Sequence, residues 1–466
     1  MPSASYDTII IGAGMSGLAA GIRLAQFDQR VLILEKHYLW GGLNSFYKQA
    51  GRRFDVGLHA LTNYVPKGTR GTPLIKLLRQ LRLRYDDLNL RPQGHSAIRF
   101  PDCSLVFTNE FARFEQEVVE RFPSQRDGFA RLVAAITEYD AFNPPDTNIG
   151  AREILAEYLS DQLLIEMLLC PLSFYGSARE GDVDWYQFVI LFRSIFQEGF
   201  ARPEGGIKPL LDLLIARYKE LGGELRMRTG VSEILHEDGH CSGVRLMDGT
   251  EISATRVLSS VGWAETLKLA GPELYAEHAN PDEIGTLSFT ESIFVMNKEP
   301  RDLGFDSTIV FFNDSETFDY KSPTSLIDPR SGVIACPNNY LSDAPLKEGI
   351  YRLTTLANYE AWKGLNKDEY AAAKESSMAE ALEVSNRYGI DPRPHTVHLD
   401  SFTPCTVERF TDKMRGAVYG ATKKRLDGNT PLANLHIIGT DQGLLGVTGS
   451  MLSGISIANR YALVPQ

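Results

Sequence analysis

Apolar residues at the start of the chain form two short continuous runs, with a helical spacing between them. The run at residues 7–11 is short enough for a buried strand, and the apolar positions from Leu18 to Phe27 fall at helical intervals. A second short run, Val31–Leu34, ends at Glu35. We therefore predict a strand, a helix and a second strand, which together begin an α/β domain.

The predicted strand and helix are joined by a glycine-rich turn, Gly12-Ala13-Gly14-Met15-Ser16-Gly17, with the spacing G-x-G-x-x-G. Gly12 allows a tight turn, Gly14 opens its backbone to a pyrophosphate, and Gly17 lets helix and strand pack closely. Free N–H groups at the start of the helix attract phosphate charge. Glu35 lies 23 positions after Gly12, where a carboxylate accepts bonds from ribose hydroxyls. These features predict a dinucleotide site, and a glycine-rich turn in an ordinary α/β unit is the alternative.

Beyond this unit, the pattern of apolar positions divides the chain into parts of different character. Residues 71–204 read mostly as helices, and short strand-like runs separated by turns occupy residues 225–259. Apolar runs between residues 287 and 357 predict a second sheet. A last strand at residues 435–438 precedes Gly439-Thr440-Asp441 and a final helix. We therefore predict an α/β fold in which the chain returns twice to its first domain.

The predicted domain boundaries follow from these returns. A discontinuous Rossmann-like domain comprises residues 1–70, 205–285 and 400–466. A mostly helical lobe, residues 71–204, is predicted to face the substrate or a membrane. Its stripe of bulky apolar side chains either lines a tunnel for a lipid or belongs to the core. A mixed sheet-and-helix substrate domain comprises residues 286–399.

Residues 74–84 have the spacing of an amphipathic helix with a basic polar side. Leucines occupy positions i, i+3, i+4 and i+7, and cationic residues lie beside them: Leu74, Leu77, Leu78 and Leu81, with Lys76, Arg79, Arg82 and Arg84. Such a helix lies either on an anionic bilayer or on the protein surface with its leucines in the core. Peripheral membrane contact through residues 74–84 is therefore kept as an alternative to a plain surface helix.

Composition and charge narrow the functional classes. The 466 residues carry a net charge of -11, which argues against non-specific binding of nucleic acid. The five cysteines are scattered without a C-x-x-C pair, and the histidines are dispersed, so we predict neither a disulfide framework nor a metal site. No apolar run approaches the ~18 residues of a membrane span, and the first residues lack the basic region of a signal peptide. We expect a cytoplasmic protein with at most peripheral membrane contact; the sequence leaves its oligomeric state open.

Several blocks along the chain resemble the flavin-containing amine oxidase and phytoene desaturase superfamily, most closely its carotenoid isomerase and retinol saturase branch. In chain order they are Gly12-Ala13-Gly14-Met15-Ser16-Gly17-Leu18, Glu35, Gly41-Gly42, Phe54-Asp55-Val56-Gly57-Leu58-His59, Pro203-Glu204-Gly205-Gly206, Thr403-Pro404-Cys405-Thr406-Val407-Glu408, Gly416-Ala417-Val418-Tyr419-Gly420 and Gly439-Thr440-Asp441. They span nearly the whole chain in the order that the family shows. The resemblance implies non-covalently bound FAD and a hydrophobic small-molecule substrate.

The resemblance also assigns cofactor contacts. It gives the pyrophosphate to Gly12, Gly14 and Gly17, the adenosine ribose to Glu35, the flavin side to Gly41 and Gly42, the adenine to Val231, and the ribityl or pyrophosphate part to Asp441. Neighbouring positions expected at the cofactor are Met15, Ser16, Lys36, Leu43, Gly439 and Val447. Trp40 stands where the family carries an arginine before the glycine pair.

The chemistry implied by the resemblance takes place at a carbon–carbon bond. Saturation or isomerisation of such a bond also needs a proton to move, so a titratable group close to the flavin is expected. His59 is the first candidate for this group and Tyr64 the second, with a purely structural histidine as the alternative for His59.

Three functions stay open from the sequence. The first is an FAD-dependent desaturase, saturase or isomerase of an isoprenoid such as a carotenoid or retinoid. The second is a flavin amine oxidase, against which the polyene-type blocks count. The third is a flavin-free escort of prenyl lipids with this fold, against which the intact glycine motif with Glu35 counts.

Overall fold

The computed structural model describes residues 5–57, 59–141, 143–145, 148–342 and 344–463. Leu58 of the predicted block before His59 lies outside the described residues. So do residues 1–4 of the predicted range 1–70 and residues 464–466 of the predicted range 400–466.

The first sheet is built from segments far apart in the sequence. Its central strand β1 pairs in parallel with β2 and with β12, so that Ile10 lies between Ile33 and Leu258. The order of strands is β10 (Val231–Glu237), β11 (His240–Leu246), β12 (Glu251–Ser259), β1 (Tyr6–Ile11), β2 (Val31–Leu34) and β9 (Glu224–Arg226), with β18 (Leu435–Ile437) also paired to β12. All seven strands come from the segments predicted to form the discontinuous Rossmann-like domain.

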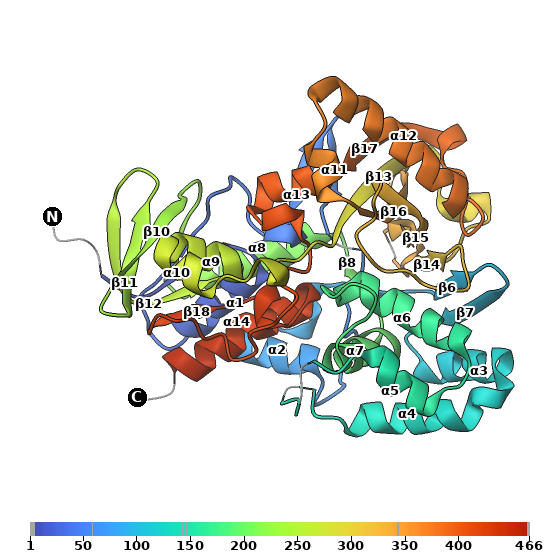
Figure 1. The fold of residues 1–466 in the computed structure, drawn as a ribbon, viewed down its shortest axis with the longest axis horizontal. Helices are drawn as coiled ribbons and strands as arrows, with labels where there is room; N and C mark the ends of the chain where they lie inside the picture. The colour runs from blue at the N-terminus through green and yellow to red at the C-terminus, as the bar shows by residue number, and fades with distance from the viewer. Residues whose placement is uncertain (1–4, 58, 142, 146–147, 343, 464–466) are drawn as a thin grey trace.

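Helices α1 (Met15–Ala25), α8 (Ile207–Glu220) and α14 (Gly446–Ala462) pack with this sheet in one hydrophobic core. The helix contacts need glycine. A Cβ on Gly17 would lie 2.1 Å from the carbonyl oxygen of Gly12, and a Cβ on Gly454 would lie 2.0 Å from that of Ser16. The last helix therefore lies directly against the backbone of the first one, and Figure 1 shows the two termini at the same end of the molecule.

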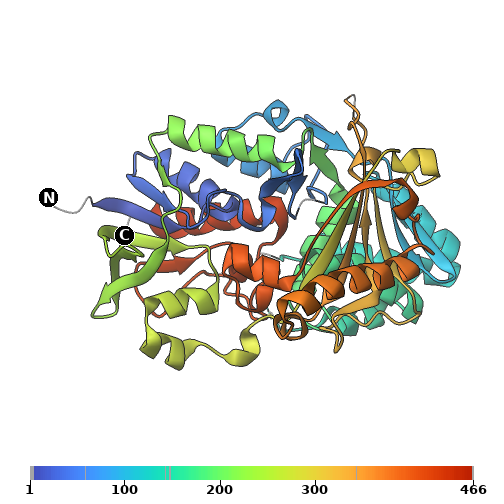
Figure 2. The same cartoon turned by 90° about the horizontal axis from the view of Figure 1, so that it is seen from above.

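A second sheet forms the other half of the molecule. Its order is β17 (Thr396–Phe402), β13 (Ser288–Met296), β16 (Gly349–Ala357), β15 (Ile327–Ala335), β14 (Ile309–Asn313), β6 (Ser96–Phe100) and β7 (Cys103–Phe107). The long helix α12 (Lys367–Ser385) covers one face of this sheet, as Figure 2 shows from above. Smaller ribbons are β3 (Phe46–Gln49) with β4 (Arg52–Asp55), and β5 (Leu90–Pro92) with β8 (Ala201–Pro203).

The segment predicted as a mostly helical lobe also contributes strands β6 and β7 to the second sheet, so its predicted character is only partly right. Its helices lie on the face of that sheet opposite α12 (Figure 1). They are α3 (Phe111–Arg121), α4 (Arg126–Glu138), α5 (Ala151–Tyr158), α6 (Gln162–Gly176) and α7 (Trp185–Phe192). Phe188, Phe192 and Phe196 of the apolar stripe are fully buried core residues, whereas Ile190 and Leu191 face the cavity described below.

The basic segment predicted at residues 74–84 forms α2 (Pro73–Leu81). Leu74, Leu77, Leu78 and Leu81 are all buried in the core beneath the first sheet and α14. The apolar side of this helix is therefore not available to a bilayer, and the interpretation as a plain surface helix replaces membrane contact through these leucines. None of the helices within the described residues combines the length and apolar character needed to cross a bilayer.

The remaining helices connect these parts of the fold. They are α9 (Trp263–Ala270), α10 (Pro272–His278), α11 (Tyr359–Lys363) and α13 (Pro404–Thr411). The turn Gly205-Gly206 before α8 is tied to β4, because Asp55 accepts hydrogen bonds from Arg202 and from the N–H of Ile207. This contact joins the Phe54 to His59 block to the residues on either side of the Pro203 to Gly206 block.

Candidate functional site

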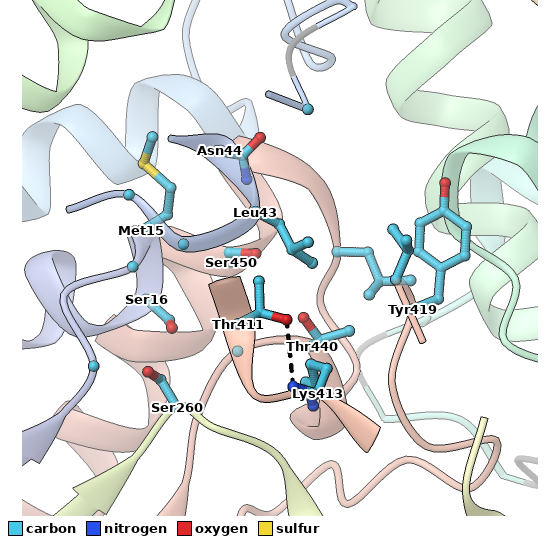
Figure 3. Close-up of a pocket in the computed structure, with 18 of the residues that line it drawn as sticks. Met15, Ser16, Leu43, Asn44, Ser260, Thr411, Lys413, Tyr419, Thr440 and Ser450 are labelled. Carbon is cyan, nitrogen blue, oxygen red and sulfur yellow. Dashed lines mark hydrogen bonds between the residues drawn. The ribbon is translucent and has the colours of Figure 1, made fainter. Parts of the chain in front are cut away.

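A cavity of about 940 Å³ lies where the first sheet, the second sheet and the helical lobe meet. One end is formed by the first glycine turn and the start of α14, and the other by α6, α7, β13 and β16. Figure 3 shows Met15, Ser16 and Ser260 on one side of this cavity and Tyr419 on the opposite side. Its size and its two unlike ends suit an elongated cofactor with a substrate beside it.

The glycine turn opens into this cavity. Gly12 has φ +99°, and a Cβ there would lie 2.3 Å from Oγ of Ser260, whereas a Cβ on Gly14 would meet no atom within 4 Å. No side chain among the described residues caps the N-terminus of α1. Its free N–H groups and the open face of Gly14 therefore leave a place for phosphate oxygens, as the motif predicts.

Glu35 lies at the end of β2 and lines the same end of the cavity. Its carboxylate accepts hydrogen bonds from the N–H of Ala13 and from the N–H of His37, each at 2.8 Å. These two bonds hold the carboxylate next to the glycine turn. Lys36 also lines the cavity and forms a 2.5 Å ion pair with Asp412.

The second glycine pair lies against the first turn. The N–H of Gly41 donates to the carbonyl of Ala13 at 2.9 Å, and both Gly41 and Gly42 have positive φ, +107° and +58°. Leu43, the next residue, lines the cavity. Trp40 does not, and its buried Nε1 has no hydrogen-bond partner among the described residues. Trp40 therefore does not take over a contact of the arginine that it replaces.

The start of α14 and the adenine side complete the predicted set. Gly439, Val447 and Val231 all line the cavity, and their contacts with the cofactor stay a prediction. Gly439 has no room for a side chain, because a Cβ there would lie 2.9 Å from Oγ of Ser16. Gly17, by contrast, packs helix against strand and does not line the cavity.

The side-chain direction of Asp441 contradicts the prediction that this residue contacts the cofactor directly. Its buried carboxylate accepts from the N–H of Trp263 at 2.6 Å and from the N–H of Ala421 at 2.9 Å, and it lies 3.3 Å from Nζ of Lys413. Burial alone would raise the pKa of Asp441, but Lys413, Lys424 and the two N–H groups lower it to about 2. The side chain therefore points into the protein, and its neighbours Thr440 and Lys413 line the cavity instead (Figure 3).

His59 lines the part of the cavity next to the second sheet. Its Nε2 lies 3.2 Å from Oε2 of Glu291 and 3.4 Å from Oγ1 of Thr354, and both of these residues line the cavity as well. Its carbonyl accepts from the hydroxyl of Tyr340 at 2.8 Å. The imidazole is thus held at the cavity wall by a carboxylate, which is a suitable arrangement for a group that transfers protons.

Tyr64 is not placed for the predicted role. Its neighbours Thr62 and Asn63 line the cavity, but Tyr64 does not. Its side chain interacts with Tyr85 instead, and its N–H donates to the carbonyl of Gly199 at 3.2 Å. A proton-transfer role for Tyr64 is therefore wrong in this structure.

Several residues of the site carry no sequence signal. Glu291 and Thr354 lie among other polar residues of strands β13 and β16, with nothing in the sequence to single them out, and Tyr175 and Gln187 lie in apolar helices. Lys413 lies between two recognisable blocks, so only its position could have drawn attention to it.

The family comparison agrees with this geometry. The model of the family "Flavin containing amine oxidoreductase" matches residues 15–461, and the chain belongs to this family. It is 24% identical to prolycopene isomerase of Arabidopsis thaliana over 98% of this chain and 82% of that protein. It is also 24% identical to all-trans-retinol 13,14-reductase of Danio rerio, over 97% of this chain and 86% of that protein.

The fold is shared more widely than the sequence. An oxidoreductase from Methanosarcina mazei superposes with a TM-score of 0.66 at 17% identity, covering 98% of this chain and all of that one. The predicted α/β fold class and the resemblance to the superfamily are confirmed. The family membership also confirms FAD as the cofactor. The open glycine turn, the uncapped start of α1 and the adjacent Glu35 are the features that fit it.

Proposed function

We propose that the protein is an FAD-dependent enzyme that acts on carbon–carbon bonds of a hydrophobic isoprenoid, carotenoid-like or retinoid-like. The observation that carries this proposal is the apolar end of the cavity. Side chains from the helical lobe, the second sheet and the block before Gly420 wall it: Phe174, Ile190, Leu191, Phe289, Val333 and Val418. Such walls favour a long apolar substrate and exclude water from it.

In the proposed reaction, the cofactor and the protein chain have different roles. FAD supplies hydride exchange with a substrate carbon. The chain holds the polyene between the walls, keeps water out and moves a proton through His59. We place the phosphate end at Gly12, Gly14, Met15 and Ser16, the ribose at Glu35, and the remaining contacts at Gly41, Gly42, Leu43, Val231, Gly439 and Val447.

Two relatives support a reaction at a carbon–carbon bond. The names prolycopene isomerase and all-trans-retinol 13,14-reductase each contain a polyene, and both proteins align with nearly the whole of this chain. A cationic amine would be favoured by a carboxylate that no cation offsets. Glu291, which lines the cavity on β13, already contacts Arg352 and His59.

Anaerobic incubation of the purified holoprotein tests this proposal. Phytoene, poly-cis-lycopene, retinol and an unsaturated fatty acid are offered to the oxidised and to the reduced protein. Flavin absorbance and the products are followed together, because isomerisation leaves the net flavin redox state unchanged.

We expect conversion of at least one isoprenoid, and no flavin reduction by putrescine or benzylamine. Rapid bleaching by an amine, with no reaction of any polyene, would establish an amine oxidase instead. A protein that purifies colourless and takes up no added FAD would favour the flavin-free escort.

A further inference from the structure

A line of polar groups connects His59 to the interior of the second sheet. Glu291 on β13 lies opposite Thr354 on β16, and Arg352 precedes Thr354 by two residues on the same face. Oε1 of Glu291 accepts from Nε of Arg352, and Oε2 faces Nε2 of His59 at 3.2 Å. Glu291 is 3% exposed and lines the cavity, whereas Arg352 is 2% exposed and does not line it, so the pair joins the cavity wall to the core of the second sheet.

The charge on Glu291 decides which nitrogen of His59 carries hydrogen. Burial alone would raise the pKa of Glu291, but Arg352 and His59 outweigh burial and hold the pKa below its usual range. The side chain is therefore a carboxylate, which only accepts hydrogen bonds. Nε2 of His59 must then be the protonated nitrogen, and in the neutral ring Nδ1 carries a lone pair.

Other contacts fix both the ring and its loop. Oγ1 of Thr354 lies 3.4 Å from Oε2 of Glu291, and its hydroxyl can donate to that oxygen. Nη2 of Arg352 donates to the carbonyl of Val56 at 2.7 Å, three residues before His59. Within the described part of the chain, no hydrogen-bond partner is found for Nδ1. Nδ1 is therefore the ring nitrogen left for a ligand in the cavity.

The geometry points to Glu291 as a positioning residue: its carboxylate keeps Nε2 of His59 protonated and leaves Nδ1 to exchange a proton with the substrate. This inference rests on the proposed function, because that function gives His59 a proton to move. When a proton is delivered, the Nδ1–H bond breaks and leaves its electron pair on Nδ1, the electron pair of a substrate π bond forms the new C–H bond, and the imidazolium becomes neutral imidazole. Glu291 keeps its charge and Nε2 keeps its hydrogen throughout.

The Glu291→Gln variant should reverse which ring nitrogen of His59 carries hydrogen, and this reversal can be measured. Arg352 has only donors, so the glutamine oxygen must face Arg352 and its NH₂ must face His59. Nε2 can accept from that NH₂ only when it carries no hydrogen, so the neutral ring becomes the Nδ1–H tautomer. Nitrogen-15 NMR of histidine-labelled holoprotein at neutral to mildly alkaline pH reads this directly. The His59 signals are identified by their loss in His59→Ala.

We expect a protonated Nε2 in the wild type and a protonated Nδ1 in Glu291→Gln, with kcat lowered about 100-fold and KM little changed. The matched control is Glu166→Gln, which removes the carboxylate of another buried pair, Arg152–Glu166 at 2.6 Å. Glu166 does not line the cavity, so this variant should lose stability and leave the His59 signals unchanged.

A protonated Nδ1 in the neutral ring of the wild type would overturn the inference without any variant, even if Glu291→Gln fails to fold. An unchanged tautomer in folded Glu291→Gln would overturn it as well. The tautomer is read without turnover. Failure of every polyene to react would therefore contradict the proposed function and leave the tautomer result standing.

Discussion

At the scale of single residues, two glycines of the first motif have opposite surroundings. The space beside Gly14 is open, whereas the space beside Gly17 is filled by the carbonyl of Gly12. A side chain on Gly14 therefore enters the cavity, and a side chain on Gly17 pushes α1 away from β1. We therefore propose that Gly14 serves cofactor binding and Gly17 serves the packing of the fold.

We expect Gly14→Val to raise the dissociation constant for FAD at least about 100-fold, because the new methyl groups occupy the phosphate site. Its free energy of unfolding as apoprotein should change little. Gly17→Ala should instead destabilise the apoprotein by about 1–3 kcal/mol through overpacking. Flavin fluorescence titration and urea unfolding of both variants test this. Equal loss of FAD binding with equal loss of stability would contradict the separation of roles.

Residue types in motifs were predicted well, but side-chain directions were not. The first motif, Glu35 and the second glycine pair are local in sequence, and the structure places Gly12, Gly14 and Glu35 at the cavity. Asp441 follows a strand in the same way, yet its carboxylate turns inward to Trp263 and Ala421. That direction depends on two segments far away in the chain, which no local pattern reveals.

At the scale of elements, α2 shows why spacing alone does not choose between bilayer and core. The four leucines predict the helix, and both environments accept the same stripe. In this structure α14 places α2 in the core. It lies beside α2, and Asn459 on α14 donates a hydrogen bond to Gln80 on α2 at 2.8 Å. The strands β6 and β7 were not predicted, because β6 pairs with β14 more than 200 residues later and no local pattern reveals that pairing.

We expect Leu77→Ala to lower the free energy of unfolding by about 2–5 kcal/mol, because Leu77 is 1% exposed in the core. Lys76→Ala on the exposed side should change it by less than about 0.5 kcal/mol. Any binding to anionic vesicles should be the same for the Lys76→Ala, Arg79→Ala double variant as for the wild type. Vesicle co-sedimentation that is lost in that double variant would restore the membrane role of this helix.

His436 on strand β18 makes a pH-dependent contribution to the free energy of unfolding. Burial first, and Arg256 second, lower the pKa of His436 from 6.5 to about 4, and its ring stacks on Tyr461 with centroids 3.9 Å apart. The unfolded chain takes up the proton first, so the stabilising contribution is full above pH 6.5 and is lost as the pH falls through 4.

We therefore expect His436→Phe, which keeps the stack, to reduce the loss of unfolding free energy between pH 7 and pH 4.5 by about 2–3 kcal/mol. Urea unfolding of both proteins at a series of pH values measures the difference. Parallel pH profiles for wild type and variant would show that His436 titrates equally in the folded and unfolded states.

At the scale of the whole molecule, the cavity exists because distant segments converge. The first glycine turn, the start of α14, the second sheet and the helical lobe each supply one wall. We propose that FAD occupies the end at the glycine turn and that the substrate occupies the end walled by Phe174, Ile190 and Leu191. Separate mutations should therefore block the two ends independently.

Ile190→Trp tests this claim most directly, because Ile190 lines the apolar end on α7 and lies far along the chain from the glycine turn. The measurement follows two quantities in anaerobic holoprotein: the FAD content, from flavin absorbance, and the conversion of an isoprenoid that the wild type converts, from its products. We expect Ile190→Trp to keep its full FAD content and to lose this conversion. Unchanged conversion by the variant, or loss of FAD together with the conversion, would contradict the account.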